Sequence, residues 1–139
     1  MTAVGKTIHG TLGFWHGLAA LQNAADVLAT SGIAPKLRPL ASKNVALVGE
    51  LAKPLHPTQR TIATLVIGAT IVEAVAAVAY LRAALGNGRS ELGFGLSLAL
   101  FGAFFLIDDA FDNYELAAKH RATFALLAAS YAACGTARE

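Results

Sequence analysis

Four mainly apolar segments alternate with polar or turn-rich stretches along the chain, and this pattern predicts four long helices. An α-helix needs about 20 apolar residues to cross the roughly 30 Å hydrocarbon layer of a membrane. Several of the segments approach or exceed that length. We therefore expect an all-α, polytopic membrane protein built as a bundle of four transmembrane helices. The expected helices cover approximately residues 7–29, 60–85, 91–115 and 120–136.

The stretch 30–59 separates the first two of these helices and contains all four prolines. It is too polar to span a membrane, but its apolar spacing predicts a short amphipathic helix that Ser42 or Asn44 caps and Lys53-Pro54 ends. We expect this helix to lie on the membrane interface, and an ordinary surface connector is the alternative. The apolar face of the short helix consists of Val45, Leu47, Val48 and Leu51.

The remaining connections are short. Glycine and asparagine at 86–90 predict a tight turn that makes the second and third helices antiparallel neighbours. A second turn is expected at 116–119, before the alanine-rich fourth helix. Four crossings place both termini on the same side of the membrane.

The composition indicates one integral membrane domain that covers residues 1–139. Hydrophobic residues make up 55% of the chain and charged residues 14%, with a mean hydropathy of +0.54, whereas soluble proteins contain about 25% charged residues. The net charge of +2 includes no basic block interleaved with aromatic residues, which argues against a nucleic acid partner. The single cysteine, Cys134, cannot form a CxxC redox pair.

The first helix is expected to be retained rather than cleaved as a signal peptide, because polar residues interrupt its apolar run. Basic residues favour a cytoplasmic location for the 30–59 connection, since seven fall on its side of the membrane and four on the other. The seven are Lys36, Arg38, Lys43, Lys53, Arg60, Lys119 and Arg121, and the four are Lys6, Arg82, Arg89 and Arg138.

Small residues form ridges on two of the expected helices. Such ridges let membrane helices approach closely, because packing rather than the expulsion of water drives their association. The ridges consist of Gly10, Gly13, Gly17, Ala20 and Ala24 in the first helix and of Gly95, Ala99 and Gly102 in the third.

Polar residues inside the expected spans are the first set of candidate site residues. In the first helix, His9, His16 and Asn23 recur every seven residues and form one stripe, with Asp26 further round the helix. Glu73 lies near the middle of the second helix, with Tyr80 on the same face, and an ionised carboxylate there costs roughly 2.5–3.5 kcal/mol on insertion scales. We expect a contact between His16 and Glu73. The set His16, Asn23, Asp26, Glu73 and Tyr80 forms either a ligand or proton site or a structural hydrogen-bond network.

An acidic cluster ends the third helix and is the second candidate site. A helix that continues to residue 115 places Asp108, Asp112 and Glu115 on one face, with Asp109 beside them. Together with His120, these carboxylates suit a divalent metal. The alternatives are ion pairs with Lys119, Arg121, Lys36 or Arg38, which we expect to prevail, and a small-molecule cavity walled by Phe14, Trp15, Phe104 and Phe105.

Two cofactors are disfavoured by the residues present in the expected spans. Haem lacks an obvious second axial ligand, because His16 is the only histidine expected deep in the membrane. Retinal lacks a lysine within a span that could form a Schiff base.

The layout resembles the DoxX-like four-helix membrane proteins. The features that carry this resemblance are the glycine-rich first helix, the connection containing KNVALVGELAKPL, the central glutamate of IGATIVEAVAAVAYL, and the acidic turn between the last two helices. The resemblance implies a four-helix bundle in a bacterial inner membrane, sometimes an accessory subunit of an oxidoreductase near the quinone pool. It assigns no site residue.

The polar residues in the spans do not form a complete catalytic motif. The sequence therefore favours a non-catalytic membrane protein, either an accessory or assembly subunit with partner subunits or further copies of itself, or a small-molecule binder. The alternative is a membrane enzyme, metal-dependent or quinone-linked, that uses Glu73 and the carboxylates of the third helix.

Overall fold

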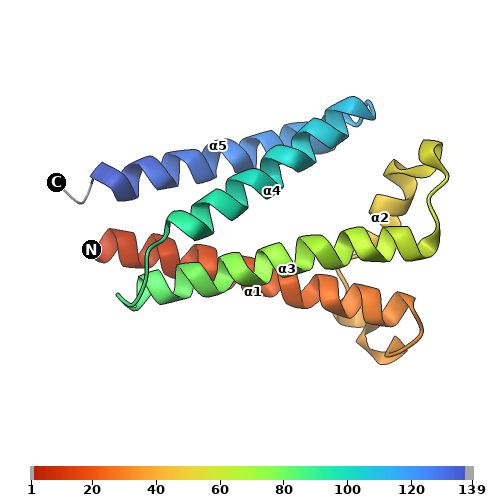
Figure 1. The fold of residues 1–139 in the computed structure, drawn as a ribbon, viewed down its shortest axis with the longest axis horizontal. Helices are drawn as coiled ribbons and strands as arrows, with labels where there is room; N and C mark the ends of the chain where they lie inside the picture. The colour runs from red at the N-terminus through yellow and green to blue at the C-terminus, as the bar shows by residue number, and fades with distance from the viewer. Residues whose placement is uncertain (1, 137–139) are drawn as a thin grey trace.

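The computed structural model describes residues 2–136, and their secondary structure is helical, which confirms the all-α class (Figure 1). Four long helices carry the fold, and three short helical segments occupy the first connection. The elements are α1 (Ala3–Thr30), η1 (Pro35–Leu40), α2 (Asn44–Leu51), η2 (Lys53–Leu55), α3 (Gln59–Ala84), α4 (Glu91–Ala110) and α5 (Tyr114–Thr136).

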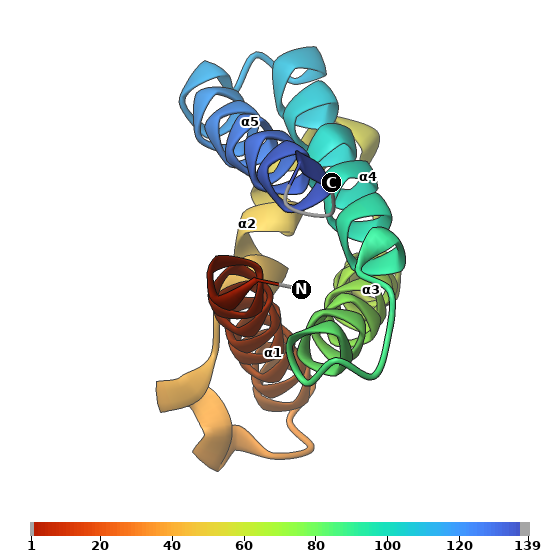
Figure 2. The ribbon, with the colours of Figure 1, turned by 90° about the vertical axis from the view of Figure 1, so that its left-hand side faces the viewer.

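The four long helices run antiparallel in succession, as the turn pattern predicted. The start of α1, the α3–α4 connection and the end of α5 lie at one end of the molecule, and the α1–α3 connection and the α4–α5 turn lie at the other (Figure 1). Seen along the helices, α1, α3, α4 and α5 follow one another around an open arc (Figure 2). Helix α1 packs along α3 and α4 along α5, whereas α1 and α5 meet over only a short stretch.

Side-chain caps and a glycine set the ends of the helices. The hydroxyl of Thr2 accepts a hydrogen bond from the backbone nitrogen of Gly5 at 3.1 Å, and Thr58 caps α3 in the same way. Helix α1 ends where Gly32 adopts a φ of 78°, a left-handed conformation that glycine enters without a steric penalty. The first and second long helices therefore begin and end close to the predicted residues.

Two glycines allow the helices to approach one another closely. A Cβ atom on Gly13 of α1 would lie 2.7 Å from the Leu81 side chain and 3.1 Å from the Leu81 backbone nitrogen. A Cβ atom on Gly93 of α4 would lie 3.1 Å from the ring of Tyr80. The ridge predicted on the first helix thus contacts α3 at Gly13, whereas Gly10 faces open space. Helix α3 is the common partner of α1 and α4.

The short helix predicted in the first connection is present as α2. Its Val45 is buried and packs in a cluster with Ile62 and Val66 of α3. The N-cap position is Lys43, with a left-handed φ of 68°, so the prediction that Ser42 or Asn44 caps this helix was wrong by one residue. The hydroxyl of Ser42 accepts a hydrogen bond from the backbone nitrogen of Asn44 at 3.2 Å from the position before the N-cap. These contacts fix α2 across the ends of α1 and α3.

The predicted boundary between the last two helices is wrong. Helix α4 ends at Ala110 instead of residue 115, and α5 begins at Tyr114 instead of residue 120, so the turn is 111–113 rather than 116–119. Asp112 adopts a left-handed φ of 57°, and the Asn113 side chain accepts a hydrogen bond from the backbone nitrogen of Leu116 at 3.4 Å. Aspartate and asparagine favour these stop and cap positions, so the helix break follows from local chemistry.

Two of the long helices, α3 and α4, are long and apolar enough to cross a membrane. Helix α4 has 20 residues, which correspond to about 30 Å along its axis. Among the described residues, α1 and α5 do not meet the same criterion, because polar and small residues lower their apolar content. The structure thus identifies two candidate spans, where the sequence pattern predicted four.

The close approach at Gly13 leads to a test of the α1–α3 packing. We expect Gly13→Ala to destabilise the protein by about 1–3 kcal/mol, because the new methyl group overpacks the contact with Leu81. Gly10→Ala is the matched control, since its methyl group enters open space and replacing a helical glycine stabilises by about 0.5–1 kcal/mol. Thermal unfolding of both variants measures the difference. Equal melting temperatures would contradict the close α1–α3 contact.

Candidate functional site

A chain of amide and carboxylate groups links α1, α2 and α3 inside the bundle. The side-chain nitrogen of Asn23 donates a hydrogen bond to the Glu73 carboxylate at 2.7 Å. The side-chain oxygen of Asn23 accepts one from the amide of Asn44 at 2.7 Å. Asn23 is 3% exposed and Glu73 6% exposed, so each provides a partner that the other needs away from water. The hydrogen bond from Asn23 therefore satisfies the buried carboxylate of Glu73, the central glutamate of α3.

Asp26, on the next turn of α1, holds the start of α2. Its carboxylate accepts hydrogen bonds from the backbone nitrogen of Val45 at 2.8 Å and from the hydroxyls of Ser42 and Thr30. Asp26 is 5% exposed, so three donors surround a buried acceptor. The residue therefore has a structural role as a cap supplied by a neighbouring helix.

His16 and Glu73 do not form the expected pair, because each is bonded to a different residue. The Nε2 atom of His16 lies 2.7 Å from the hydroxyl of Ser97 on α4. The same hydroxyl lies 3.2 Å from the hydroxyl of Tyr80 on α3 and 2.8 Å from the carbonyl oxygen of Gly93. The prediction of a direct contact between His16 and Glu73 was wrong because it paired the deepest polar residues of α1 and α3 and left Ser97 of α4 out.

The protons of this triad have one arrangement that satisfies all three contacts. A serine hydroxyl has one proton and two acceptor positions. Ser97 donates its proton to the Gly93 carbonyl and accepts one from Tyr80, so Nε2 of His16 is the second donor to Ser97. A nucleophilic serine instead gives its proton to the histidine. The geometry thus favours a hydrogen-bond link among α1, α3 and α4.

Aromatic rings enclose the triad. The rings of His16 and Tyr80 stack with their centroids 5.8 Å apart, and Trp15 stacks on Phe101 at 5.4 Å. Phe94 packs edge-on against Tyr80 at 5.0 Å. His16 is 1% exposed, and Ser97 and Tyr80 are 0% exposed. Packing at this density gives a substrate no route to the Ser97 hydroxyl.

At the opposite end of α4, a histidine and an arginine of α5 face two carboxylates of the acidic cluster. Asp108 is buried, and its carboxylate lies 2.5 Å from Nδ1 of His120, which is largely buried. Arg121 approaches Asp109 at 3.6 Å, and both are exposed. These contacts join the end of α4 to the first turns of α5.

Glu115 and Asp112 lie in different environments from the first two acids, because the turn separates them from α4. Glu115 forms an exposed ion pair with Lys119 at 2.6 Å, and this hydrogen bond lowers the pKa of Glu115. Asp112 accepts a hydrogen bond from the Tyr114 hydroxyl at 2.8 Å, which raises the pKa of Tyr114. The expected single stripe of Asp108, Asp112 and Glu115 is therefore not formed, since the helix breaks between its members.

No group of three or more metal-ligating side chains occurs within residues 2–136. The oxygen ligands that the acidic cluster offers are spread over two helices and a turn, and basic side chains already contact several of them. Ca²⁺ and Mg²⁺ prefer six or more oxygen ligands around one point, and Zn²⁺ prefers four ligands. The geometry of the described residues in the acidic cluster thus favours ion pairs over a metal centre.

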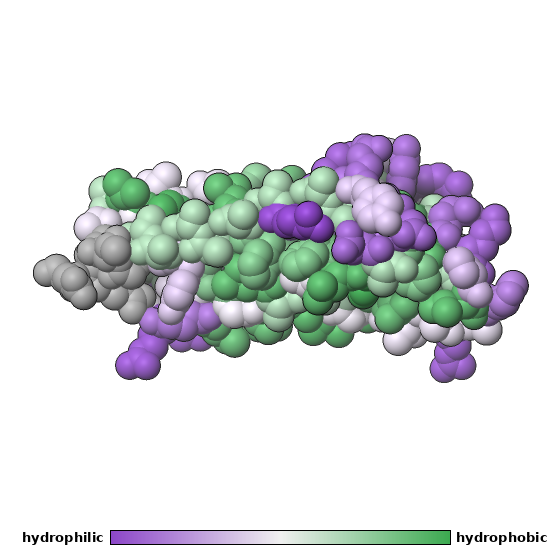
Figure 3. All heavy atoms as spheres, turned by 90° about the horizontal axis from the view of Figure 1, so that it is seen from above, coloured by the Kyte–Doolittle hydropathy of each residue, from purple (hydrophilic) through white to green (hydrophobic). Residues whose placement is uncertain are grey.

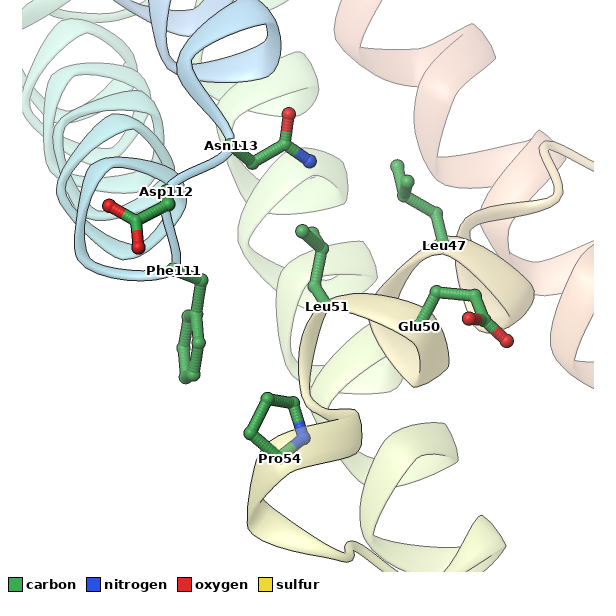
Figure 4. A pocket seen from close by; sticks show the side chains of 7 residues that line it. All are labelled: Leu47, Glu50, Leu51, Pro54, Phe111, Asp112 and Asn113. Carbon is green, nitrogen blue, oxygen red and sulfur yellow. The ribbon is translucent and has the colours of Figure 1, made fainter.

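A surface cavity opens beside this cluster, between the first connection and the α4–α5 turn. It has a volume of about 410 Å³. Figure 4 shows Leu47, Leu51 and Asn113 pointing into the gap, with Phe111 and Pro54 along one side. The lining residues are Leu47, Glu50, Leu51, Pro54, Phe111, Asp112 and Asn113.

The aromatic cavity predicted from the sequence involves different residues, and these pack against other rings or face outward. Phe14 is 70% exposed, and Trp15 stacks on Phe101. Phe104 packs against His120, and Phe105 packs against Phe124. The prediction missed the observed cavity because its residues come from the short helix α2 and from a turn that the sequence pattern placed inside a helix.

Asn23 provides a test of the buried hydrogen-bond chain that links Asn44, Asn23 and Glu73. We expect Asn23→Ala to lower the free energy of unfolding by about 1–2 kcal/mol, because Glu73 and Asn44 both lose a buried partner. Gln22→Ala is the control at the adjacent, exposed position of α1. Chemical unfolding in detergent compares the two variants. A loss of stability no greater in Asn23→Ala than in Gln22→Ala would show that the buried chain contributes nothing.

His120 provides a test of the buried acid at the end of α4. We expect His120→Ala to destabilise the protein by about 2 kcal/mol, because the buried Asp108 carboxylate loses its hydrogen-bond donor. Arg121→Ala removes the partner of the exposed Asp109 and should cost less than about 1 kcal/mol. Melting temperatures of the two variants separate these effects. A larger loss in Arg121→Ala would contradict the assignment of the stronger contact.

No protein-family model, curated protein or solved structure matches the chain.

Proposed function

We propose that the chain is a small integral membrane protein of four helices with a binding role that involves no catalysis. It would hold a small molecule at one membrane surface or act as an accessory subunit of a larger complex. The observation that carries the proposal is a distribution of side chains opposite to that of a soluble protein. Polar groups are hydrogen-bonded to one another inside the bundle, and large apolar groups lie outside it.

The outer surface of the long helices supports the membrane location. Only 33% of the residues in the most apolar stretch of α3 and 28% in that of α4 are buried. Leu21, Leu65, Ile71 and Leu106 are each more than half exposed. The face in Figure 3 is mostly hydrophobic along its middle, and hydrophilic residues gather at the end that carries the first connection and the α4–α5 turn. Apolar surface of this extent is suited to lipid and not to water.

The same distribution supports a position of all four long helices in the bilayer. His16 and Asn23 of α1 bond to residues of α4 and α3, so α1 lies alongside the two candidate spans. Helix α5 packs along α4 from the acidic turn to the buried residue Leu127. Polar residues in α1 reduce its apolar content without preventing insertion, because they face protein.

A membrane enzyme is the second candidate, and the hydrogen bond between Ser97 and His16 is the observation that favours it. The two atoms lie at the distance of a nucleophile and its general base. Against this stand the full burial of Ser97 and the donation of its proton to a backbone carbonyl. The surface cavity beside α2 is lined by residues other than His16, Tyr80 and Ser97, so it gives no access to the Ser97 hydroxyl.

Membership of the DoxX-like proteins is part of this proposal. The antiparallel order of four long helices, the short helix in the first connection and the central Glu73 are consistent with the layout that suggested it. A bacterial inner membrane and a partner subunit of a membrane complex follow from that resemblance alone.

The topology can be tested by labelling single cysteines in intact membrane vesicles. In a Cys134→Ala background, Val4→Cys and Asn87→Cys should react with an impermeant maleimide from one side, and Lys36→Cys from the other. The wild-type protein should also remain in the membrane fraction at alkaline pH, because its exposed apolar faces contact lipid.

The position of Val4 separates four spans from two. If only α3 and α4 crossed the membrane, Val4 would be labelled from the same side as Lys36. Release of the protein by alkaline carbonate would overturn the membrane proposal as a whole. Labelling of Asn87 and Lys36 from the same side would remove the α3 span.

A further inference from the structure

The cavity between α2 and the α4–α5 turn has the chemical features of a binding site. Four of its seven lining residues are apolar, namely Leu47, Leu51, Pro54 and Phe111. Its volume of about 410 Å³ lies in the range of small-molecule sites, which is roughly 300–1,000 Å³. The polar groups Glu50, Asp112 and Asn113 come from both walls, so a ligand there would contact two separate parts of the chain.

The charged groups of the cavity lie at its edge. Figure 4 shows the carboxylates of Glu50 and Asp112 on the outer sides of the gap, while Leu51 and the Asn113 amide point into it. A ligand that fits this arrangement has an apolar part inside the gap and a charged part at the edge. The two carboxylates specify a positive charge.

One of the acids that line the cavity has no basic partner among the described residues. Asp108, Asp109 and Glu115 face His120, Arg121 and Lys119 at 2.5–3.6 Å. Glu50 approaches Lys53 at 3.7 Å, and this pair is exposed and weak, as is the pair of Asp109 and Arg121. Asp112 has a neutral partner, the Tyr114 hydroxyl. Within the acidic cluster, the carboxylate without a basic partner is therefore that of Asp112, which lies at the edge of the cavity.

We propose that this cavity binds an amphipathic organic cation, such as an amine or quaternary ammonium group that carries a short hydrocarbon chain. The proposal rests on the binding role argued above and specifies its ligand class. The hydrocarbon chain packs against Leu47, Leu51 and Phe111, and the cationic group lies at the edge formed by Asp112 and the ring of Phe111, while Glu50 on the other side of the gap adds to the negative charge of the site. A divalent metal fits less well, because two carboxylates and one amide from separate elements do not provide its ligand shell.

The probe for this site is hexyltrimethylammonium, titrated calorimetrically into the protein in nanodiscs of zwitterionic lipid, with empty nanodiscs as the reference. We expect a Kd of about 0.1–1 mM, which is typical of a ligand with few non-hydrogen atoms. Tetramethylammonium tests the contribution of the chain, and hexanesulfonate tests the sign of the charge. Both should bind at least about tenfold more weakly.

Two isosteric variants locate the cation within the acidic cluster. Asp112→Asn should weaken binding about fivefold, which corresponds to the upper range of an exposed ion pair. Asp109→Asn is the matched control, because Asp109 belongs to the same cluster, is paired with Arg121 and does not line the cavity. It should bind the probe as the wild-type protein does. Phe111→Ala should also weaken binding, with the unfolding curve as a check that the turn is intact.

Equal binding of hexanesulfonate, or equal effects of Asp112→Asn and Asp109→Asn, would overturn the proposal. Failure of the cavity and failure of the membrane assignment are distinguishable in this design. A protein that enters nanodiscs and binds no probe contradicts only the ligand assignment. A protein that stays out of nanodiscs contradicts the membrane assignment, and the same titration in aqueous buffer then tests the cavity separately.

Discussion

The need to satisfy polar groups among apolar helices is the constraint on which this structure depends. Asn23 meets it most directly, because one amide bonds Glu73 on α3 and Asn44 on α2 from a position on α1. The Ser97 hydroxyl on α4 likewise hydrogen-bonds to His16 on α1 and to Tyr80 on α3. Away from water, an unsatisfied polar group costs several kcal/mol, so these bonds favour the helix pairing that satisfies them. The polar residues thus specify which helices pair, and large apolar residues cover the outer surface of the bundle.

Close packing supplies the second part of the stability. In the membrane setting proposed above, hydrophobic collapse contributes little between helices, so their association depends on how closely the backbones approach. Gly13 and Gly93 let α1 and α4 approach α3 closely at the consecutive residues Leu81 and Tyr80. The same region contains the buried cluster of Ala76, Tyr80 and Phe94. Hydrogen bonds and close contacts therefore coincide on α3, which is the central element of the fold.

The helices and their order were predictable from the sequence because apolar periodicity and turn residues are local signals. The site was less predictable, because pairing depends on rotations that no local signal fixes. Glu73 was correctly singled out, but its partner was assigned to His16 rather than Asn23, one helical stripe position away. The break after Ala110 was missed although Asp112 and Asn113 carried its signal, because the apolar run before them was extended into the acidic residues. The contact of Asn44 with Asn23 was missed because it depends on how α2 lies across α1 and α3, which no local signal fixes.

The open arc of helices leaves the two ends of the bundle unequally held. Helices α4 and α5 form one unit and α1 and α3 another, and the two units are joined from Gly93 and Tyr80 to the stacked rings of Trp15 and Phe101 but diverge toward the acidic turn (Figure 1). Phe111 lies 10 residues beyond Phe101, or about 15 Å along the helix axis. Over that length a tilt of about 5° between the two units would displace the turn by about 1 Å. The width of the cavity therefore depends on the angle that the packing around Tyr80 and Phe101 sets between the two units.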